Sequence, residues 1–301
     1  MSDAVPDRVK KLARRLFALA VVTTIAWFLF RQLRALDWPL VLRSLPTSPW
    51  FYLCLTARYM LLPVTEVLCY SAAWSVNLFR HFGVFLVKRL MNSSVAGASG
   101  DAYFLVWAAQ NLKIGYRSAF SAVKDVTLLS AAAANGVAVI VFGAYLAFGD
   151  RSVLDGVEPR VVALIVGVTL ASAVLSVVIV GFRGKVLGVD TPTMRRILGF
   201  HTIRAGGNLV LLGLQWWAAI PEVSFGAWIN LLVIQLVVSR TPFIPARELL
   251  FLSIALAMVN TIDAPAASLE AMFLVDAALI QLLAIPSLIL ATLWRSPPPK
   301  N

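Results

Sequence analysis

Long apolar runs separated by short polar segments dominate the chain. Six or more of them approach the roughly 20 residues that a helix needs to cross a bilayer, and strand-like alternation of apolar and polar positions is absent. The pattern predicts an all-α, polytopic membrane bundle of about eight transmembrane helices in a single domain over 1–301. The predicted helices cover about 16–30, 50–74, 126–148, 160–181, 204–220, 226–239, 248–260 and 268–294.

Two interruptions break this pattern. The segments "FGVFLVKRLMNSSVAG" and "DAYFLVWAAQN" are each about half a membrane long and meet at a run of Gly and Ser, which predicts a re-entrant hairpin over about 82–112. The alternative is a pair of amphipathic helices that lie on the cytoplasmic face. Two prolines in "SRTPFIPARELL" predict a second helix break at about 240–248.

The charges of the loops predict how the bundle is oriented. The segment 182–204 is rich in Arg and Lys, whereas 149–159, 221–224 and 260–268 are acidic or neutral. By the positive-inside rule, eight crossings with both termini in the cytoplasm satisfy these segments, and the chain is expected in the inner (cytoplasmic) membrane. The loop that carries Arg31, Arg34 and Arg43 disagrees, because this topology places it outside.

Composition excludes a soluble protein and several kinds of chemistry. Hydrophobic residues make up 60% of the chain and charged residues 14%, with a mean hydropathy of +0.83. The net charge of +11 comes from cations near helix ends, which indicates contact with anionic lipid and not with nucleic acid. Cys54 and Cys69 are too far apart on one helix to pair. Because neither His81 nor His201 has a partner at metal-ligand spacing, no metal, cofactor or catalytic motif is expected.

Charged residues inside the predicted bundle are the candidate functional residues. Each costs about 2.5–3.5 kcal/mol at the centre of a membrane helix, so each is a functional hypothesis. The candidates for binding a lipid headgroup lie on the predicted helices or at the two breaks: Arg58, Glu66, Lys88, Arg89, Asn92, Asp101, Arg240, Arg247, Glu248 and Asp276.

Several of these residues allow more than one interpretation. Arg58 and Glu66 could neutralise one another or pair with neighbouring helices. The cations near the breaks could hold a phosphate, since Arg donates two parallel hydrogen bonds to such a group. Asp101 and Glu248 stand at the starts of apolar segments, where an acidic side chain is expected to cap the backbone N–H groups.

Four further polar residues lie near the predicted helix ends. Lys124 and Asp125 are expected to form an interfacial ion pair where the helix at 126–148 begins. His201 and Arg204 are expected to anchor the next cytoplasmic helix end at the interface.

The order of these segments resembles the transmembrane region of lysylphosphatidylglycerol synthases, a flippase-like family. The resemblance rests on "NSSVAGASGDAYFLVWAAQNLKIGYRSAFSAVKDVTLL" and on "VVSRTPFIPARELLFLSIAL", and covers nearly the whole chain. Two positions depart from the family pattern: Gly100-Asp101 stands where Gly-Glu is usual, with no Arg in the next turn, and "FIPAR" replaces a Gly-rich segment. The resemblance implies translocation of a lipid, without the aminoacyl-transferase domain of the full-length synthases.

The sequence therefore predicts a flippase-like protein. Its expected partners are membrane lipids with anionic headgroups, and its expected cargo is an anionic or modified phospholipid or a polyprenyl-phosphate-type lipid. Two alternatives remain: a scaffold or accessory subunit of a lipid or envelope biosynthesis pathway, and a lipid-modifying enzyme. A homo-oligomer or a partner in a biosynthetic complex is compatible with each. With no ATP-binding motif, transport would be passive or driven by an ion gradient.

Overall fold

The fold was obtained as a computed structural model. It describes residues 38–94, 98–148, 159–240 and 266–293, isolated positions between 16 and 34, and Phe251 and Ala255. Most of the predicted helix at 248–260, and with it Arg247 and Glu248, lies outside the described residues.

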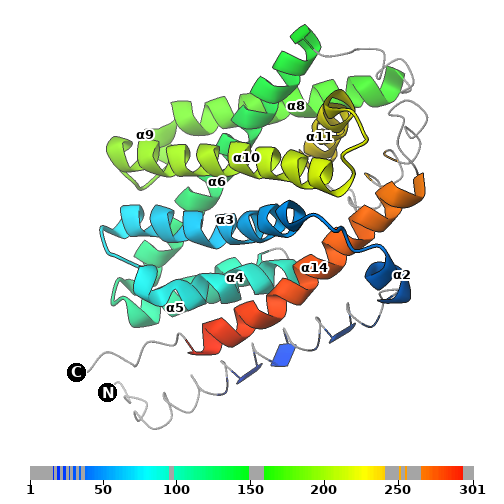
Figure 1. The fold of residues 1–301 in the computed structure, drawn as a ribbon. Helices are drawn as coiled ribbons and strands as arrows, with labels where there is room; N and C mark the ends of the chain where they lie inside the picture. Colours follow the sequence, from blue (N-terminus) through cyan, green and yellow to red (C-terminus); the bar gives the residue numbers. More distant parts are fainter. Residues whose placement is uncertain are drawn as a thin grey trace, which may run out of the picture.

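Within these ranges the protein is entirely helical, which confirms the predicted all-α class. Figure 1 shows long helices side by side, with α14 crossing the others obliquely. In chain order the elements are α2 (Trp38–Arg43), α3 (Pro49–Trp74), η1 (Phe79–His81), α4 (Phe82–Ser94), α5 (Ser99–Asn111), α6 (Gly115–Phe148), α8 (Pro159–Gly181), α9 (Arg183–Val186), α10 (Thr191–Ala219), α11 (Phe225–Arg240) and α14 (Ala266–Leu293).

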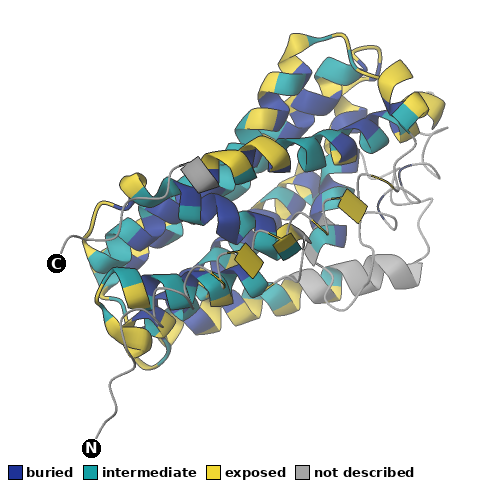
Figure 2. Ribbon diagram, turned by 90° about the horizontal axis from the view of Figure 1, so that it is seen from below, coloured by how far each residue is buried: buried dark blue, intermediate teal, exposed yellow. Residues whose placement is uncertain are grey.

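Four helices are long and apolar enough to cross a membrane, which indicates an integral membrane protein. They are Pro49–Trp74, Gly115–Phe148, Thr191–Ala219 and Ala267–Ala291, and shorter apolar helices cover Leu170–Gly181 and Phe225–Leu236. The described residues thus support four of the eight predicted crossings by length and composition. Figure 2 shows exposed residues along the outer faces of the helices. Many of these are large apolar side chains, among them Leu170, Val174 and Val177 of α8, as expected for a surface that faces lipid.

Two helices begin earlier than the sequence predicts. α6 starts at Gly115 and not near 126, and α10 starts at Thr191 and not near 204. The start of α10 has a local cause: Asp190 Oδ1 accepts a hydrogen bond from the Thr193 N–H at 3.2 Å, and a proline lies in the first turn. Of the cations that suggested a loop, Arg183 and Lys185 lie on α9 and Arg195 and Arg196 on the first turns of α10, all four exposed, whereas Arg204 lies farther along α10.

The hairpin predicted over 82–112 is present as two antiparallel helices. α4 and α5 have 13 residues each, so each is about 20 Å long and reaches half of the roughly 39 Å of α3. Figure 1 shows both beside α3, ending partway along it. Phe85 and Phe104 are fully buried against α3 and α6. The hairpin therefore belongs to the interior of the bundle, where irregular backbone is tolerated, and its re-entry at membrane depth stays a prediction.

The two ends of the bundle differ in charge. The segments at the end formed by the C-terminus of α3, the start of α6, α9 and the start of α10 lie together in Figure 1. They carry the cations Arg80, Lys113, Arg117, Arg183, Lys185, Arg195 and Arg196. The described segments at the opposite end, 43–48 and 220–224, carry only Arg43 and Glu222.

Candidate anion-binding cavity

A cavity of about 520 Å³ lies among α3, α6, α10 and α11, with Arg89 reaching it from α4 and Ile280 from α14. Its volume falls within the roughly 300–1,000 Å³ that is typical of small-molecule sites. No described carboxylate lines it. Its polar lining includes three arginines and several neutral groups: Arg58, Arg89, Arg204, Ser130, Asn208 and Gln235.

The arginines lie far from the helix ends. Arg204 stands about 20 Å along α10 from either end, at 1.5 Å per residue. Arg58 is about 14 Å from the start of α3, and Arg89 is about 10 Å from the start of the half-length α4. All three guanidinium groups therefore belong to the middle part of the bundle, where an uncompensated charge is most costly.

Helical spacing brings the lining residues onto inward faces. On α10, Arg204, Asn208 and Leu212 follow one another at intervals of four and share one face. α6 contributes small residues to the opposite wall, including Ala131 and Ala134, which leave the space open.

Arg58 is held by a polar contact between three helices. Its Nη1 donates to Gln215 Oε1 of α10 and lies 3.5 Å from Asp276 Oδ1 of α14. Gln215 Nε2 donates to the same Asp276 oxygen at 2.5 Å. Of the two alternatives predicted for Arg58, the structure therefore shows pairing with neighbouring helices and not with Glu66. The Arg58 Nε is buried and has no hydrogen-bond partner within the described ranges.

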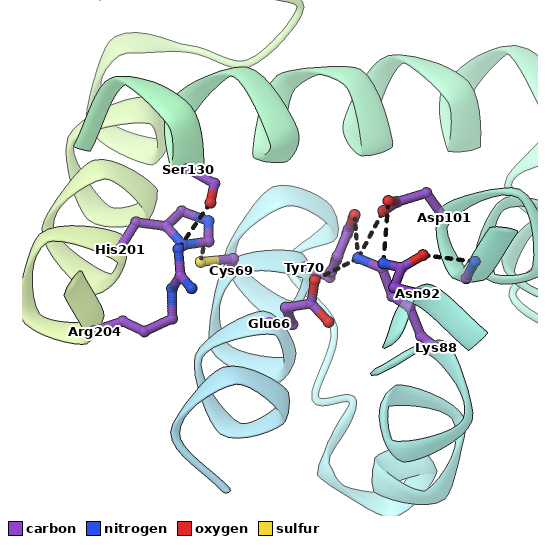
Figure 3. Close-up of polar contacts among 10 residues, drawn as sticks. Glu66, Cys69, Tyr70, Lys88, Asn92, Asp101, Ser130, His201 and Arg204 are labelled. Carbon is purple, nitrogen blue, oxygen red and sulfur yellow. Dashed lines mark hydrogen bonds and ion pairs between the residues drawn. The ribbon is translucent and has the colours of Figure 1, made fainter. Parts of the chain in front are cut away.

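Arg89 and Arg204 have no described carboxylate within ion-pair distance. The Arg89 guanidinium lies over the ring of Tyr59, 4.1 Å from its centroid. Arg204 donates to Ser130 Oγ at 2.9 Å, as Figure 3 shows. Its Nε is buried and has no partner in the part of the chain that the structure describes. The cavity therefore holds two cations, neither neutralised by contact with a described acidic group.

His201 lies one turn before Arg204 and is almost fully buried, at 1% exposure. Its Nε2 is 3.4 Å from the Cys69 thiol sulfur. The prediction that His201 and Arg204 anchor a helix end at the interface is wrong, because α10 begins about three turns before His201 and almost four before Arg204. The two side chains are consequently inside the bundle.

Lys88 lies at the centre of a second polar network beside the cavity (Figure 3). It is 1% exposed, and its Nζ lies 2.5 Å from Glu66 Oε1 and 3.0 Å from Asp101 Oδ1. It also donates to the Tyr70 hydroxyl at 3.3 Å and lies 5.3 Å from the Phe104 ring centroid. This network ties the hairpin to α3 through one cation and two carboxylates.

Asn92 joins the end of α4 to the start of α5. Its Oδ1 accepts a hydrogen bond from the Gly100 N–H at 2.7 Å, and its Nδ2 donates to Asp101 Oδ2 at 3.3 Å. Asn92 therefore takes the helix-capping role that the sequence assigns to Asp101, whose carboxylate pairs with Lys88. The two helices are so close that a Cβ on Gly100 would lie 2.0 Å from the Lys88 carbonyl oxygen.

The predicted ion pair between Lys124 and Asp125 is present, with Lys124 Nζ 2.8 Å from Asp125 Oδ1. It lies about ten residues into α6 and not at the start of the helix. Asp125 is fully buried, and its Oδ2 accepts from the N–H groups of Gly188 and Val189. The pair thus holds the segment before α10 against α6.

The candidates from the sequence separate into three groups. Arg58 and Arg89 line the cavity, with Asp276 behind Arg58; Glu66, Lys88, Asn92 and Asp101 form the network beside it. Arg240 is the last residue of α11, and its side chain is not described. Arg247 and Glu248 lie outside the described residues. The structure adds polar lining residues that were not candidates, among them Arg204, Ser130, Asn208 and Gln235.

Chemically, the cavity is suited to binding an anion. Arginine offers a planar set of donors that matches the oxygens of a phosphate or carboxylate, and buried Nε–H groups without acceptors leave such donors free. No group of three or more His, Cys, Asp or Glu in the described part of the chain could hold a metal ion. Comparison with known protein families, with characterised proteins and with solved structures finds no match for this chain.

Proposed function

We propose that this protein is a flippase-like membrane protein that binds an anionic or modified phospholipid, or a polyprenyl-phosphate-type lipid, and moves its headgroup across the inner membrane. The observation that carries this proposal is the cavity at mid-depth lined by Arg58, Arg89 and Arg204.

The energetic argument starts from the cost of the arginines. At about 2.5–3.5 kcal/mol each on insertion scales, three mid-helix arginines are expensive for a bundle that could pack apolar residues instead. Arg58 recovers part of this cost through Asp276, whereas Arg89 and Arg204 have no described carboxylate in contact. Glu66, whose charge acts on both arginines, is itself paired with Lys88. A phosphate bound between Arg89 and Arg204 would supply the missing counter-charge.

The architecture supports movement of a headgroup. The hairpin of α4 and α5 ends partway along α3, and Arg89 of this hairpin reaches the cavity. A headgroup could therefore be held at mid-depth while its acyl chains stay against the apolar outer surface. By the positive-inside rule we place the end that carries Arg183 and Lys185 in the cytoplasm, and both termini with it.

Leaflet exchange tests the proposal directly. The protein would be reconstituted in vesicles with fluorescently labelled phosphatidylglycerol, and the fraction accessible to a membrane-impermeant quencher measured over time. We expect faster exchange than in protein-free vesicles, and a loss of most of the gain in Arg204→Gln. The matched control is Arg196→Gln, an exposed arginine on the same helix, which should exchange at the wild-type rate.

Two results would count against the proposal. Exchange at the protein-free rate for phosphatidylglycerol, phosphatidic acid and a polyprenyl phosphate would refute transport and favour the scaffold alternative. Equal rates in Arg204→Gln and wild type would show that exchange occurs without the cavity.

A further inference from the structure

We infer that the cavity selects a phosphate headgroup that carries no cationic group, so that it takes a phosphatidylglycerol-type lipid and rejects ammonium-bearing lipids. This inference rests on the proposed function and narrows its "anionic or modified" lipid to the unmodified anionic class. Its basis is the sign and arrangement of the charges that line the cavity and lie beside it.

The first step is a count of charges by contact. Arg58 is balanced by Asp276, and Lys88 is in contact with both Glu66 and Asp101. Arg89 and Arg204 are left without a described carboxylate in contact, while the Lys88 network carries a net charge of about −1 beside them. The described interior thus has an excess of one positive charge, which a phosphodiester monoanion would neutralise.

The second step concerns hydrogen bonds. Arg58 Nε and Arg204 Nε are buried donors without an acceptor among the described residues, and both arginines line the cavity. A phosphate oxygen is an acceptor that satisfies such donors with charge-assisted hydrogen bonds. The donors therefore match the phosphodiester part of a headgroup.

The third step concerns the rest of the headgroup. An ammonium group needs acceptors, preferably a carboxylate, but the described lining has none and presents three arginines instead. Its neutral polar groups, including Ser130, Asn208 and Gln235, can bond to hydroxyls of a glycerol or sugar. Gln235 Oε1 is buried and has no donor in the described part of the chain, so it can accept from such a hydroxyl.

Phosphatidylglycerol and phosphatidylethanolamine with the same acyl chains test this selectivity. Both contain the phosphodiester, but the first carries a glycerol diol where the second carries an ammonium group. The purified protein in detergent would be mixed with both at equal concentration, and bound lipid measured by native mass spectrometry. We expect phosphatidylglycerol to be preferred by about tenfold or more, equivalent to about 1.4 kcal/mol. Arg196→Gln should keep the preference and Arg204→Gln should lose most of it.

A charge-introducing variant gives an independent test. Asn208→Asp is nearly isosteric and places a carboxylate in the lining. We expect it to reduce the preference for phosphatidylglycerol by about tenfold. The new carboxylate would do so either by pairing with the ammonium of phosphatidylethanolamine or by neutralising an arginine that binds the phosphate. Arg196→Glu, which places a carboxylate at an exposed position of the same helix outside the lining, should keep the wild-type preference.

The outcomes separate this inference from the proposed function. Equal binding of the two lipids, or a preference for phosphatidylethanolamine, overturns the inference, even where leaflet exchange is observed. A preference for phosphatidylglycerol without exchange of any lipid leaves the inference standing and refutes transport. Displacement of phosphatidylglycerol by millimolar inorganic phosphate overturns a lipid ligand in favour of a free anion.

Discussion

The closest approach inside the hairpin gives a sharp prediction for Gly100→Ala. A Cβ at this position would lie 2.0 Å from the backbone carbonyl oxygen of Lys88 and 2.7 Å from Asn92 Oδ1. Real Cβ atoms essentially never come closer than 3.0 Å to such atoms, so the two helices must separate. Because the obstacle is backbone and not the tip of a flexible side chain, rotamer changes cannot relieve it.

The expected magnitude follows from this geometry. Overpacking of a well-packed site costs about 1–3 kcal/mol, and separation would also weaken the hydrogen bond from Gly100 N–H to Asn92. The matched control is Gly199→Ala on α10, where an added Cβ meets nothing within 4 Å. That variant should gain about 0.5–1 kcal/mol, because alanine restricts the unfolded chain more than glycine does. The two alanine variants should therefore differ by about 1.5–4 kcal/mol.

The assay is equilibrium unfolding in mixed detergent micelles, followed by tryptophan fluorescence. Hydrogen exchange of the hairpin amides adds a local measurement, and Gly100→Ala should raise exchange in α4 and α5 more than in α10. Equal stability of the two alanine variants would refute the close packing of the hairpin, and with it the position of the Lys88 network.

Three further predictions concern the buried and capping charges. Lys88→Met should destabilise the fold by about 3–5 kcal/mol, because it leaves the carboxylates of Glu66 and Asp101 unpaired. Adding Glu66→Gln and Asp101→Asn should restore at least half of the lost stability in the same unfolding assay. Asp125→Ala should lower the free energy of unfolding by about 1–3 kcal/mol for each of the two backbone N–H groups that lose their acceptor. Lys124→Ala is the comparison and should have a smaller effect. Equal effects of the two variants would contradict the role of Asp125 as an acceptor for these N–H groups. Hydrogen bonds from the side chain and backbone of the first turn of α10 lower the pKa of Asp190, so its stabilising effect should be full above the unfolded pKa and disappear as the pH falls through the folded one. Thermal unfolding should therefore show Asp190→Ala as less stable than wild type at pH 7 but not at strongly acidic pH. Asp190→Asn should keep the cap, with an effect on stability that does not depend on pH. A deficit for Asp190→Ala that persists in acid would argue against the cap.

The sequence predicted the class of fold because membrane helices carry a strong composition signal. The hairpin at 82–112 was also predictable, since its two apolar segments are too short to span a bilayer and meet at small residues. Pairing between distant charges was not: nothing in the sequence places Arg58 beside Gln215 and Asp276, which lie on helices far away in the chain.

Arg204 was missed for a specific reason. The cations between 183 and 204 suggested a cytoplasmic loop, so the predicted helix began where the charges ended. The signal that could have corrected this is "DTPT" at 190–193, in which Asp190 caps the helix and a proline occupies its first turn. A helix starting at Thr191 places Arg204 near its middle and therefore inside the bundle.

The capping role of Asn92 was hidden for another reason. An acidic side chain near the start of a helix usually accepts hydrogen bonds from the first backbone N–H groups of that helix. Asp101 was therefore predicted as the cap. Here a cation from the partner helix of the hairpin, Lys88, occupies the carboxylate. A tertiary contact thus overrides the local preference, and the amide of Asn92 bonds to the free N–H instead.

The most direct test of the central claim is a density map of the protein in lipid nanodiscs that contain phosphatidylglycerol. We predict density for a phosphate within hydrogen-bond distance of Arg204 and Arg89, continuous with acyl-chain density on the outer surface of the bundle. A cavity that holds only water, or a carboxylate of the chain itself against these two arginines, would contradict the claim that it binds a lipid headgroup.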